Sequence, residues 1–196
     1  MRVLVTGGCG FIGSHFVRRI LKRNTISKIF NLDLLTYSGH LGNLSDISDE
    51  RYEFVHGSIN NYDLLEELLI DKGVDIVVNF AAESHVDRSI HSVSKFIETN
   101  VRGTGCILDA IVNSQTSNRS ISLVHVSTDE VYGSLGPDDG PFTEETPLDQ
   151  RDDGQANPEQ RIATLTRLVV KFQAQGMGRA DEIRRLKEIV KKPCRG

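Results

Sequence analysis

A glycine-rich run near the start of the chain, Gly7-Gly8-Cys9-Gly10-Phe11-Ile12-Gly13, has the composition of a phosphate-binding loop. Glycine has no Cβ, so a phosphate can approach the backbone closely, and the amides at a helix start supply donors and positive potential. Asp33 stands twenty residues after Gly13, where a carboxylate could accept hydrogen bonds from an adenine ribose. The pattern predicts an NAD site, because Asp33 would repel the 2′-phosphate of NADP. A tight structural turn with an unrelated aspartate is the alternative.

Two other segments carry side chains that could serve such a site. In an open parallel sheet the ligand lies beyond the carboxyl ends of the strands, which places Phe80-Ala81-Ala82 and Ser127-Thr128 beside the cofactor. The two alanines would let a dinucleotide pass, although they could equally be packing residues. Asp129 and Glu130 are adjacent carboxylates that could act as an acid and a base, or could form a solvated loop pair.

The elements that would position these residues alternate between short apolar runs and helical patterns. Runs rich in valine and isoleucine predict strands at Arg2–Thr6, Lys28–Asp33, Tyr52–His56, Val74–Phe80 and Ile121–Ser127. Helical patterns lie near Ile12–Arg23, Tyr62–Lys72 and Val93–Asn113, and the polar segment Tyr37–Glu50 predicts an irregular connection. This alternation predicts an α/β fold with a Rossmann-type parallel sheet covered on both faces. We assign residues 1–148 to this NAD-binding domain.

The segment 149–196 differs in kind from the rest of the chain. Two helical patterns lie near Glu159–Gln175 and Ala180–Lys192, without a strand pattern. Residues 1–150 hold 12 Lys and Arg against 21 Asp and Glu, whereas residues 151–196 hold 11 against 6. A basic tail could bind nucleic acid, but no nucleic-acid motif accompanies it, so we interpret the charge as a solvated helical face. We expect a helical C-terminal tail and no nucleic-acid partner.

Composition and cysteine usage argue against several other classes of protein. No window approaches the length of a membrane span, and the first residues form an apolar strand pattern rather than a secretory signal. The three cysteines, Cys9, Cys106 and Cys194, are odd in number and lack metal-ligand spacing. We expect a cytoplasmic protein with free thiols, no membrane association and no bound metal.

Three segments of the chain resemble the dTDP-glucose 4,6-dehydratases, a family of extended short-chain dehydrogenases/reductases. They are Val5–Ser14 around the glycine loop, Asn79–Ser89 with the string Ala-Ala-Glu-Ser-His-Val-Asp-Arg-Ser, and Val126–Gly133 with Ser-Thr-Asp-Glu-Val-Tyr-Gly. The nucleotide-sugar 4-epimerases share the glycine loop but lack the adjacent acids after the fifth strand. The resemblance covers about the first three-quarters of the chain. It implies an NAD-dependent lyase that removes water from dTDP-glucose in deoxysugar biosynthesis.

The resemblance also implies roles for individual residues. NAD oxidises the sugar at C4, Glu130 removes the acidified C5 proton, Asp129 protonates the departing C6 hydroxyl, and hydride returns from NADH to C6. Thr128 bonds the 4-hydroxyl. The implied cofactor positions beyond the glycine loop and Asp33 are Ser58, Ile59, Ala81, Ala82, Ser84 and Thr99, and the implied substrate positions are Ser84, His85, Arg88 and Thr128. Ser58 departs from the family, which usually has an aspartate there to hold the adenine amino group. We therefore expect weaker adenine recognition.

One family motif is missing from the sequence. The family's Tyr-x-x-x-Lys helix, whose tyrosine takes the hydroxyl proton, should follow Thr146-Pro147-Leu148. Family spacing puts Gly154 and Pro158 at the tyrosine and lysine positions, and no Tyr-x-x-x-Lys occurs anywhere in the chain. The family's C-terminal substrate-binding domain is also absent. We therefore expect a truncated and impaired dehydratase, with a non-catalytic NAD-binding fragment or interaction module as the alternative.

The origin of the tail has two explanations. A truncated or frame-disrupted gene would leave a tail without family information. A genuine replacement would use the helix from Glu159 to cover the sheet face that the Tyr/Lys helix normally covers. Members of the family form dimers through the Tyr/Lys helix and the helix after the fourth strand. A homodimer of this chain would therefore have one of its two contact helices altered.

Overall fold

The computed structural model describes residues 1–84, 93–133, 135–136, 138–143 and 145–147. A five-stranded parallel sheet has the order β3-β2-β1-β4-β5. The strands are β1 (Arg2–Thr6), β2 (Lys28–Asp33), β3 (Tyr52–His56), β4 (Ile76–Asn79) and β5 (Ser122–His125). The helices are α1 (Phe11–Leu21), α2 (Tyr62–Ile70), α4 (Val93–Phe96) and α5 (Thr104–Ser114), with 3-10 turns η1 (Leu41–Leu44) and η3 (Asp129–Tyr132) and a π-helical segment η2 (Ile97–Gly103).

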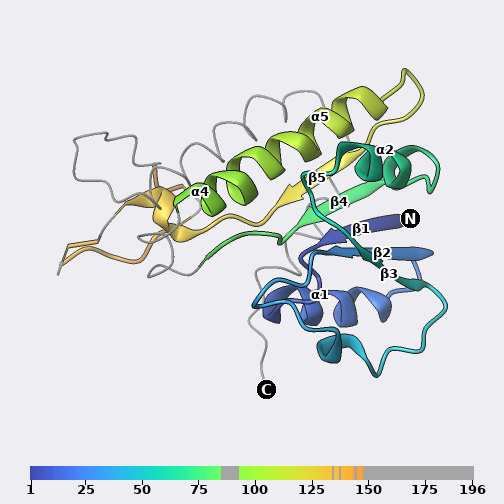
Figure 1. Ribbon diagram of the computed structural model, residues 1–196. Helices are drawn as coiled ribbons and strands as arrows, with labels where there is room; N and C mark the ends of the chain where they lie inside the picture. Colours follow the sequence, from blue (N-terminus) through green and yellow to red (C-terminus); the bar gives the residue numbers. More distant parts are fainter. Residues whose placement is uncertain (85–92, 134, 137, 144, 148–196) are drawn as a thin grey trace.

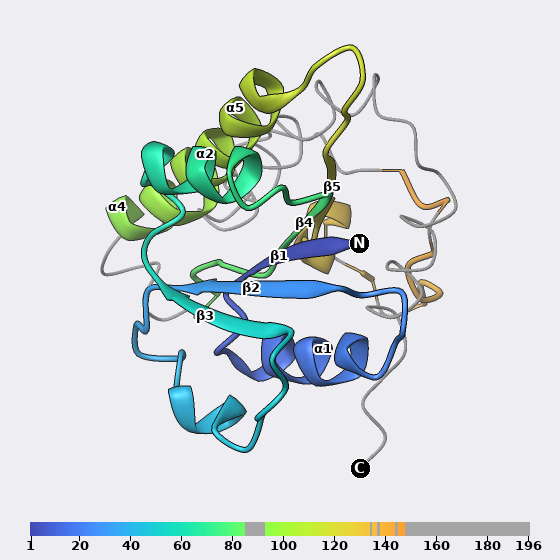
Figure 2. The ribbon, with the colours of Figure 1, turned by 90° about the vertical axis from the view of Figure 1, so that its right-hand side faces the viewer.

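The sheet is buried between two layers of helices, with α1 on one face and α2, α4 and α5 on the other (Figures 1 and 2). On the α1 side, Val5 and Ile29 from the sheet pack with Phe16 of the helix. On the opposite side, Leu4 packs in a core that includes Leu65 of α2 and helix α5. Successive side chains of a strand point to opposite faces, so the continuous apolar runs of β1 and β4 are explained by burial on both sides. The predicted α/β class and parallel sheet are confirmed.

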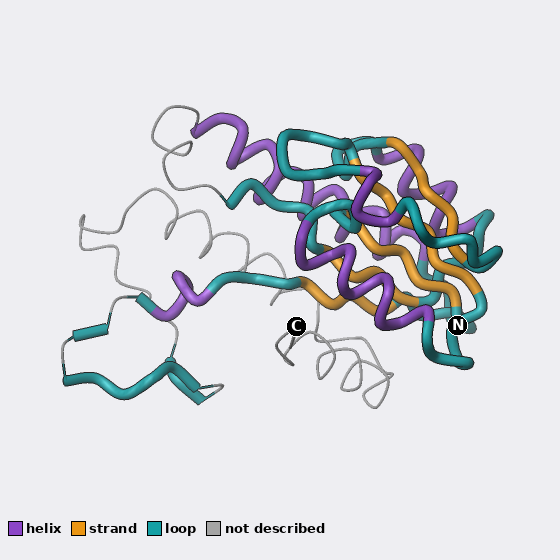
Figure 3. The backbone as a smooth tube through the Cα atoms, turned by 90° about the horizontal axis from the view of Figure 1, so that it is seen from below, coloured by secondary structure: helices purple, strands orange, loops and turns teal. Residues whose placement is uncertain are grey.

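The order of the strands creates a switch point between β1 and β4. The chain runs outward from β1 to β2 and β3, then returns to the other side of β1 for β4 and β5. At such a point the connections that follow neighbouring strands diverge and leave a crevice at the carboxyl edge of the sheet. The segment after β5 leads away from the sheet to η3 (Figure 3).

Three of the five strands have the bounds that the sequence predicts, and two are shorter. The residues that follow β4 and β5 still make one backbone hydrogen bond each to a neighbouring strand. The Phe80 N–H donates to the Thr6 carbonyl at 2.9 Å, and the Val126 N–H donates to the Asn79 carbonyl at 3.1 Å. The predicted irregular segment Tyr37–Glu50 contains the single turn η1. The two predicted tail helices in 149–196 lie outside the described residues.

Candidate cofactor site

The glycine loop follows β1 in a conformation that needs glycine at two positions. Gly7 has a φ of +69°, in the left-handed region, and a Cβ there would lie 2.6 Å from the backbone nitrogen of Ala81. A Cβ on Gly13 would meet the carbonyl oxygen of Gly7 and would lie 2.7 Å from the Cα of Gly8. The absence of side chains therefore lets the turn, the start of α1 and the segment after β4 lie close together.

Helix α1 begins at the cavity with unused backbone donors. The N-cap residue, Gly10, has no side chain that could cap the helix. The carbonyl of Gly10 accepts the first helical hydrogen bond, from the Ser14 N–H at 3.0 Å. The amides of the first turn have no partner within the helix. Phe11 and Ile12 are 73% and 57% exposed, so their side chains do not cover this end of the helix. Free amides and the helix dipole make this end suitable for a pyrophosphate.

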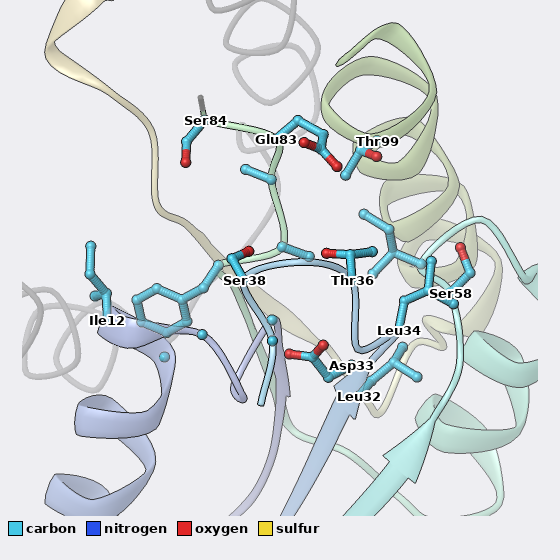
Figure 4. A pocket seen from close by; sticks show the side chains of 18 of the residues that line it. Ile12, Leu32, Asp33, Leu34, Thr36, Ser38, Ser58, Glu83, Ser84 and Thr99 are labelled. Atoms are coloured by element: carbon cyan, nitrogen blue, oxygen red, sulfur yellow. The ribbon is translucent and has the colours of Figure 1, made fainter. Parts of the chain in front are cut away.

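Asp33, the last residue of β2, is a buried carboxylate fixed by two backbone amides. The Cys9 N–H donates to Oδ2 at 2.8 Å, and the Leu35 N–H donates to Oδ1 at 2.8 Å. Leu35 has a φ of +56°, a turn that brings its amide back to the carboxylate. The side chain of Asp33 reaches the floor of the cavity (Figure 4). Each carboxylate oxygen keeps further acceptor capacity for a hydroxyl group.

The glycine loop, Asp33 and the segment after β4 enclose a cavity of about 510 Å³. This volume lies in the range of small-molecule and cofactor sites. The structure brings every predicted cofactor position into its lining: Gly7, Gly10, Phe11, Ile12, Gly13, Asp33, Ser58, Ile59, Ala81, Ala82, Ser84 and Thr99. These residues come from four connections that are far apart in sequence. Cofactor contact by each of them stays a prediction.

The wall opposite Asp33 is built by the segment after β4 and by η2. The Asn100 side chain fixes this segment, because its Oδ1 accepts from the Glu83 N–H at 2.8 Å and its Nδ2 donates to the Glu83 carbonyl at 2.9 Å. Figure 4 shows Glu83, Ser84 and Thr99 on this side of the cavity. The predicted helix Val93–Asn113 is thus interrupted by a π-helical segment where it contacts the cavity, a feature often found at functional sites.

Ser58 lies at the end of the cavity that follows β3. Its hydroxyl oxygen accepts from the Asn60 N–H at 3.1 Å, and Asn60 in turn donates to the Glu98 carbonyl at 3.2 Å. The hydroxyl therefore offers its proton and one remaining lone pair to the cavity. This end can bind a base, but Ser58 presents no carboxylate to an exocyclic amino group.

Of the predicted catalytic string, the structure describes the side chain of Thr128 alone. Thr128 is exposed and does not line the cavity. Asp129 and Glu130 begin the η3 turn, which Val131 anchors by burial, while the side chains of the two acids lie outside what the structure describes. The predicted substrate residues His85 and Arg88, and the motif positions Gly154 and Pro158, also lie outside the described residues.

Three polar side chains, Thr6, Asn79 and His125, form a hydrogen-bonded row across β1, β4 and β5. The Thr6 hydroxyl donates to the Asn79 Oδ1, and the Asn79 Nδ2 lies 3.0 Å from the Nδ1 of His125. Burial lowers the pKa of His125 to about 4, so its ring is neutral at pH 7 and accepts the amide proton. These hydrogen-bonded side chains join the ends of β1, β4 and β5. The cavity wall follows β4, and the string Thr128-Asp129-Glu130 follows β5.

Sequence reasoning placed Phe80 beside the cofactor but missed nine residues of the cavity lining: Leu32, Leu34, Thr36, Ser38, Gly39, Gly57, Asn60, Glu83 and Glu98. Leu34 and Gly57 could have been predicted as lining residues, because they directly follow β2 and β3 and ligands lie at the carboxyl edge of such a sheet. The placement of Ser38 and Gly39 depends on the turn through Leu35, which no spacing rule indicated. Within the described part of the chain, no cluster of three metal-ligating side chains occurs and no helix is long and apolar enough to span a bilayer.

The parallel sheet, its switch point and the glycine turn together define a Rossmann-type fold. The family model described as GDP-mannose 4,6 dehydratase matches residues 4–152, and the chain belongs to this family. The dTDP-glucose 4,6-dehydratase 1 of Escherichia coli K12 is 46% identical over 155 residues, covering 76% of this chain and 43% of that protein. The low-salt glycan biosynthesis protein Agl12 of Haloferax volcanii is 47% identical over 152 residues, covering 77% of this chain and 46% of the relative.

Solved structures agree with this assignment. The dTDP-glucose 4,6-dehydratase DesIV of Streptomyces venezuelae, crystallised with NAD, has a TM-score of 0.76 and 46% identity, covering 88% of this chain and 51% of that chain. A UDP-Glc/GlcNAc 4-epimerase of Campylobacter jejuni has a TM-score of 0.74 at 23% identity, which shows the shared fold alone. The resemblance to dTDP-glucose 4,6-dehydratases is confirmed. The chain spans less than half the length of the curated relatives named above.

Proposed function

We propose that this chain binds NAD in the cavity beside the glycine loop. The observation that carries the proposal is the Asp33 carboxylate, fixed by the Cys9 and Leu35 amides at the cavity floor. It is placed to accept hydrogen bonds from the adenine ribose, while the start of α1 receives the pyrophosphate. A second negative charge from a 2′-phosphate would lie against Asp33, so NAD is favoured over NADP.

The residues of the cavity fit such a cofactor. The backbone at Gly7 and Gly13 has no room for side chains. The small side chains of Ala81 and Ala82 leave space on the opposite side of the cavity. Ser84 and Thr99 supply hydroxyl groups on the β4 side, where the nicotinamide half would lie. When bound, NAD supplies an acceptor for hydride from a sugar hydroxyl.

A titration of NAD by calorimetry tests the binding proposal. Asp33→Ala should weaken NAD binding by about 10²- to 10⁴-fold, because two charge-assisted hydrogen bonds contribute roughly 1.5–3 kcal/mol each when fully formed. Asp109→Ala removes the same charge from an exposed position on α5 and should leave the affinity unchanged. Equal affinity in the wild type and Asp33→Ala would refute the assignment of the ribose site.

We propose further that the protein acts in nucleotide-sugar metabolism as a dTDP-glucose 4,6-dehydratase. The relatives of about 45% identity support this, together with the intact Thr128-Asp129-Glu130 string on the connection after β5. Glu130 would serve as the base at C5, Asp129 as the acid at the C6 hydroxyl, and Thr128 as a donor to the 4-hydroxyl. Ser84, His85 and Arg88 would contact dTDP-glucose.

The second candidate is NAD binding without turnover. Gly154 and Pro158, at the positions where the family has tyrosine and lysine, favour it. Loss of a general base commonly lowers a rate by about 10²- to 10⁴-fold. A turnover assay with dTDP-glucose separates the candidates: formation of the 4-keto-6-deoxy product supports the dehydratase, and NAD binding without product supports the second candidate.

We also propose that the protein works in the cytoplasm. Cys9 and Cys106 are both free, and desolvation by burial raises the pKa of each thiol. Free thiols are typical of a reducing compartment. Fractionation of cells that express the protein tests this, and recovery in a membrane or secreted fraction would contradict it.

A further inference from the structure

The described residues that line the cavity carry only negative charge. Three are ionisable, Asp33, Glu83 and Glu98, and none of the described lining residues is a lysine, arginine or histidine. Asp33 accepts hydrogen bonds from two backbone amides, and Glu98 forms an ion pair with Arg102 at 2.8 Å. No described cation pairs with Glu83 in this way. Glu83 is therefore the acidic residue of the lining whose charge is least compensated within the described structure.

The backbone holds Glu83 at a defined place on the cavity wall. Both its N–H and its carbonyl are bonded to the Asn100 side chain, at 2.8 and 2.9 Å, so η2 fixes this part of the wall. Residue 83 is half-buried, and Figure 4 shows its side chain beside Thr99, across the cavity from Asp33. The backbone that carries this carboxylate is thus held at the cavity wall.

The topology indicates which half of a dinucleotide lies near this charge. Asp33 ends β2 on one side of the switch point, and Glu83 follows β4 on the other side. A dinucleotide crosses such a switch point with its pyrophosphate at the glycine loop. With the adenine ribose at Asp33, the nicotinamide half is directed to the side of Glu83.

We infer that the Glu83 carboxylate makes this site bind the oxidised dinucleotide more tightly than the reduced one. The inference rests on the proposed NAD binding. Oxidised nicotinamide carries a positive charge that is lost on reduction, whereas the rest of the dinucleotide is unchanged. A fixed negative charge on this side of the cavity stabilises the first form and not the second. Glu83 is thereby a determinant of redox-state specificity.

Calorimetric titrations of NAD⁺ and NADH against the full chain, in the wild type and in Glu83→Gln, test the inference. Glutamine keeps the size of the side chain and leaves the backbone bonds to Asn100 available. The ratio of the NADH to the NAD⁺ dissociation constant should exceed one in the wild type and fall by about threefold to tenfold in Glu83→Gln, as expected for a unit charge several ångströms away in a partly exposed site. The difference should shrink as salt is added.

Glu67→Gln is the matched control, because it removes one carboxylate from the exposed surface of α2 and should not change the ratio. Circular dichroism of each variant shows that the fold is retained. An unchanged ratio in Glu83→Gln, with both forms still bound, would overturn the redox inference while leaving the NAD proposal intact. Failure of the wild type to bind either form would overturn the NAD proposal, and the inference with it.

Discussion

The substitution Gly13→Ala should destabilise the protein by crowding the junction between the glycine loop and α1. The added Cβ would meet the Gly7 carbonyl oxygen and would lie 2.7 Å from the Gly8 Cα. Carbon atoms pack at about 3.5–4.0 Å, so backbone, not a flexible side chain, must move by roughly 1 Å. Overpacking of this kind costs about 1–3 kcal/mol.

Thermal unfolding followed by circular dichroism measures this effect. For a chain of this size, 1 kcal/mol corresponds to roughly 2–4 °C in Tm, so Gly13→Ala should lower Tm by about 2–12 °C. The affinity for NAD should fall as well, because movement of α1 displaces the amides at its start.

Gly105→Ala is the matched control for Gly13→Ala, since the same methyl group is added in the first turn of α5. A Cβ at Gly105 meets nothing within 4 Å. Alanine is favoured over glycine in a helix by about 0.5–1 kcal/mol, so this variant should gain roughly 1–4 °C in Tm. The two variants should therefore move in opposite directions. A Gly13→Ala protein as stable as the wild type would refute the close packing of loop and helix.

Three other perturbations have defined outcomes. Asn100→Ala leaves the half-buried amide of Glu83 without its partner, so it should destabilise the protein by about 1–3 kcal/mol in denaturant titrations and weaken NAD binding. His125 has its pKa lowered to about 4 by burial, so unfolding takes up a proton and stability should fall as the pH drops from 6.5 towards 4; His125→Asn should flatten the dependence of Tm on pH in that range. Burial, with the nearby charge of Asp33, raises the pKa of Cys9 to about 11, so stability should fall as the pH rises from 9 to 11, and the thiol should resist alkylation at pH 8 unless the protein is unfolded.

Local sequence pattern was sufficient for the half of the sheet formed by β1, β2 and β3. β1, β2 and β3 have the predicted bounds because each apolar run is ended by residues that turn or solvate the chain. At β4 and β5 the apolar pattern continues beyond the ladder, since Phe80 and Val126 are still bonded to a neighbouring strand by one amide each. Apolar composition reports burial, whereas strand bounds depend on which partner strand is present beside each residue.

The two main features of the cavity were predictable because each depends on residues close in sequence. A glycine turn followed by a helix, and a carboxylate at the end of the next strand, have a fixed spacing in this fold. The place of Glu83 in the opposite wall was missed because it depends on Asn100, seventeen residues further along the chain and within a π-helical segment. Such a contact is set by how α4, η2 and α5 pack on the sheet, and periodicity alone predicted a regular helix there.

The proposed cofactor site and the proposed catalytic string lie on different connections of the chain. Every described residue that lines the cavity lies between Gly7 and Thr99, while the acid string begins at Thr128 on a different connection. A part-buried contact between Asn79 and His125 joins the ends of β4 and β5, from which the two regions depart. Substitutions in the glycine loop should therefore impair NAD binding and any turnover together, whereas substitutions at Thr128 should affect turnover alone. This separation explains how a chain without a Tyr-x-x-x-Lys motif can retain the geometry of a cofactor site.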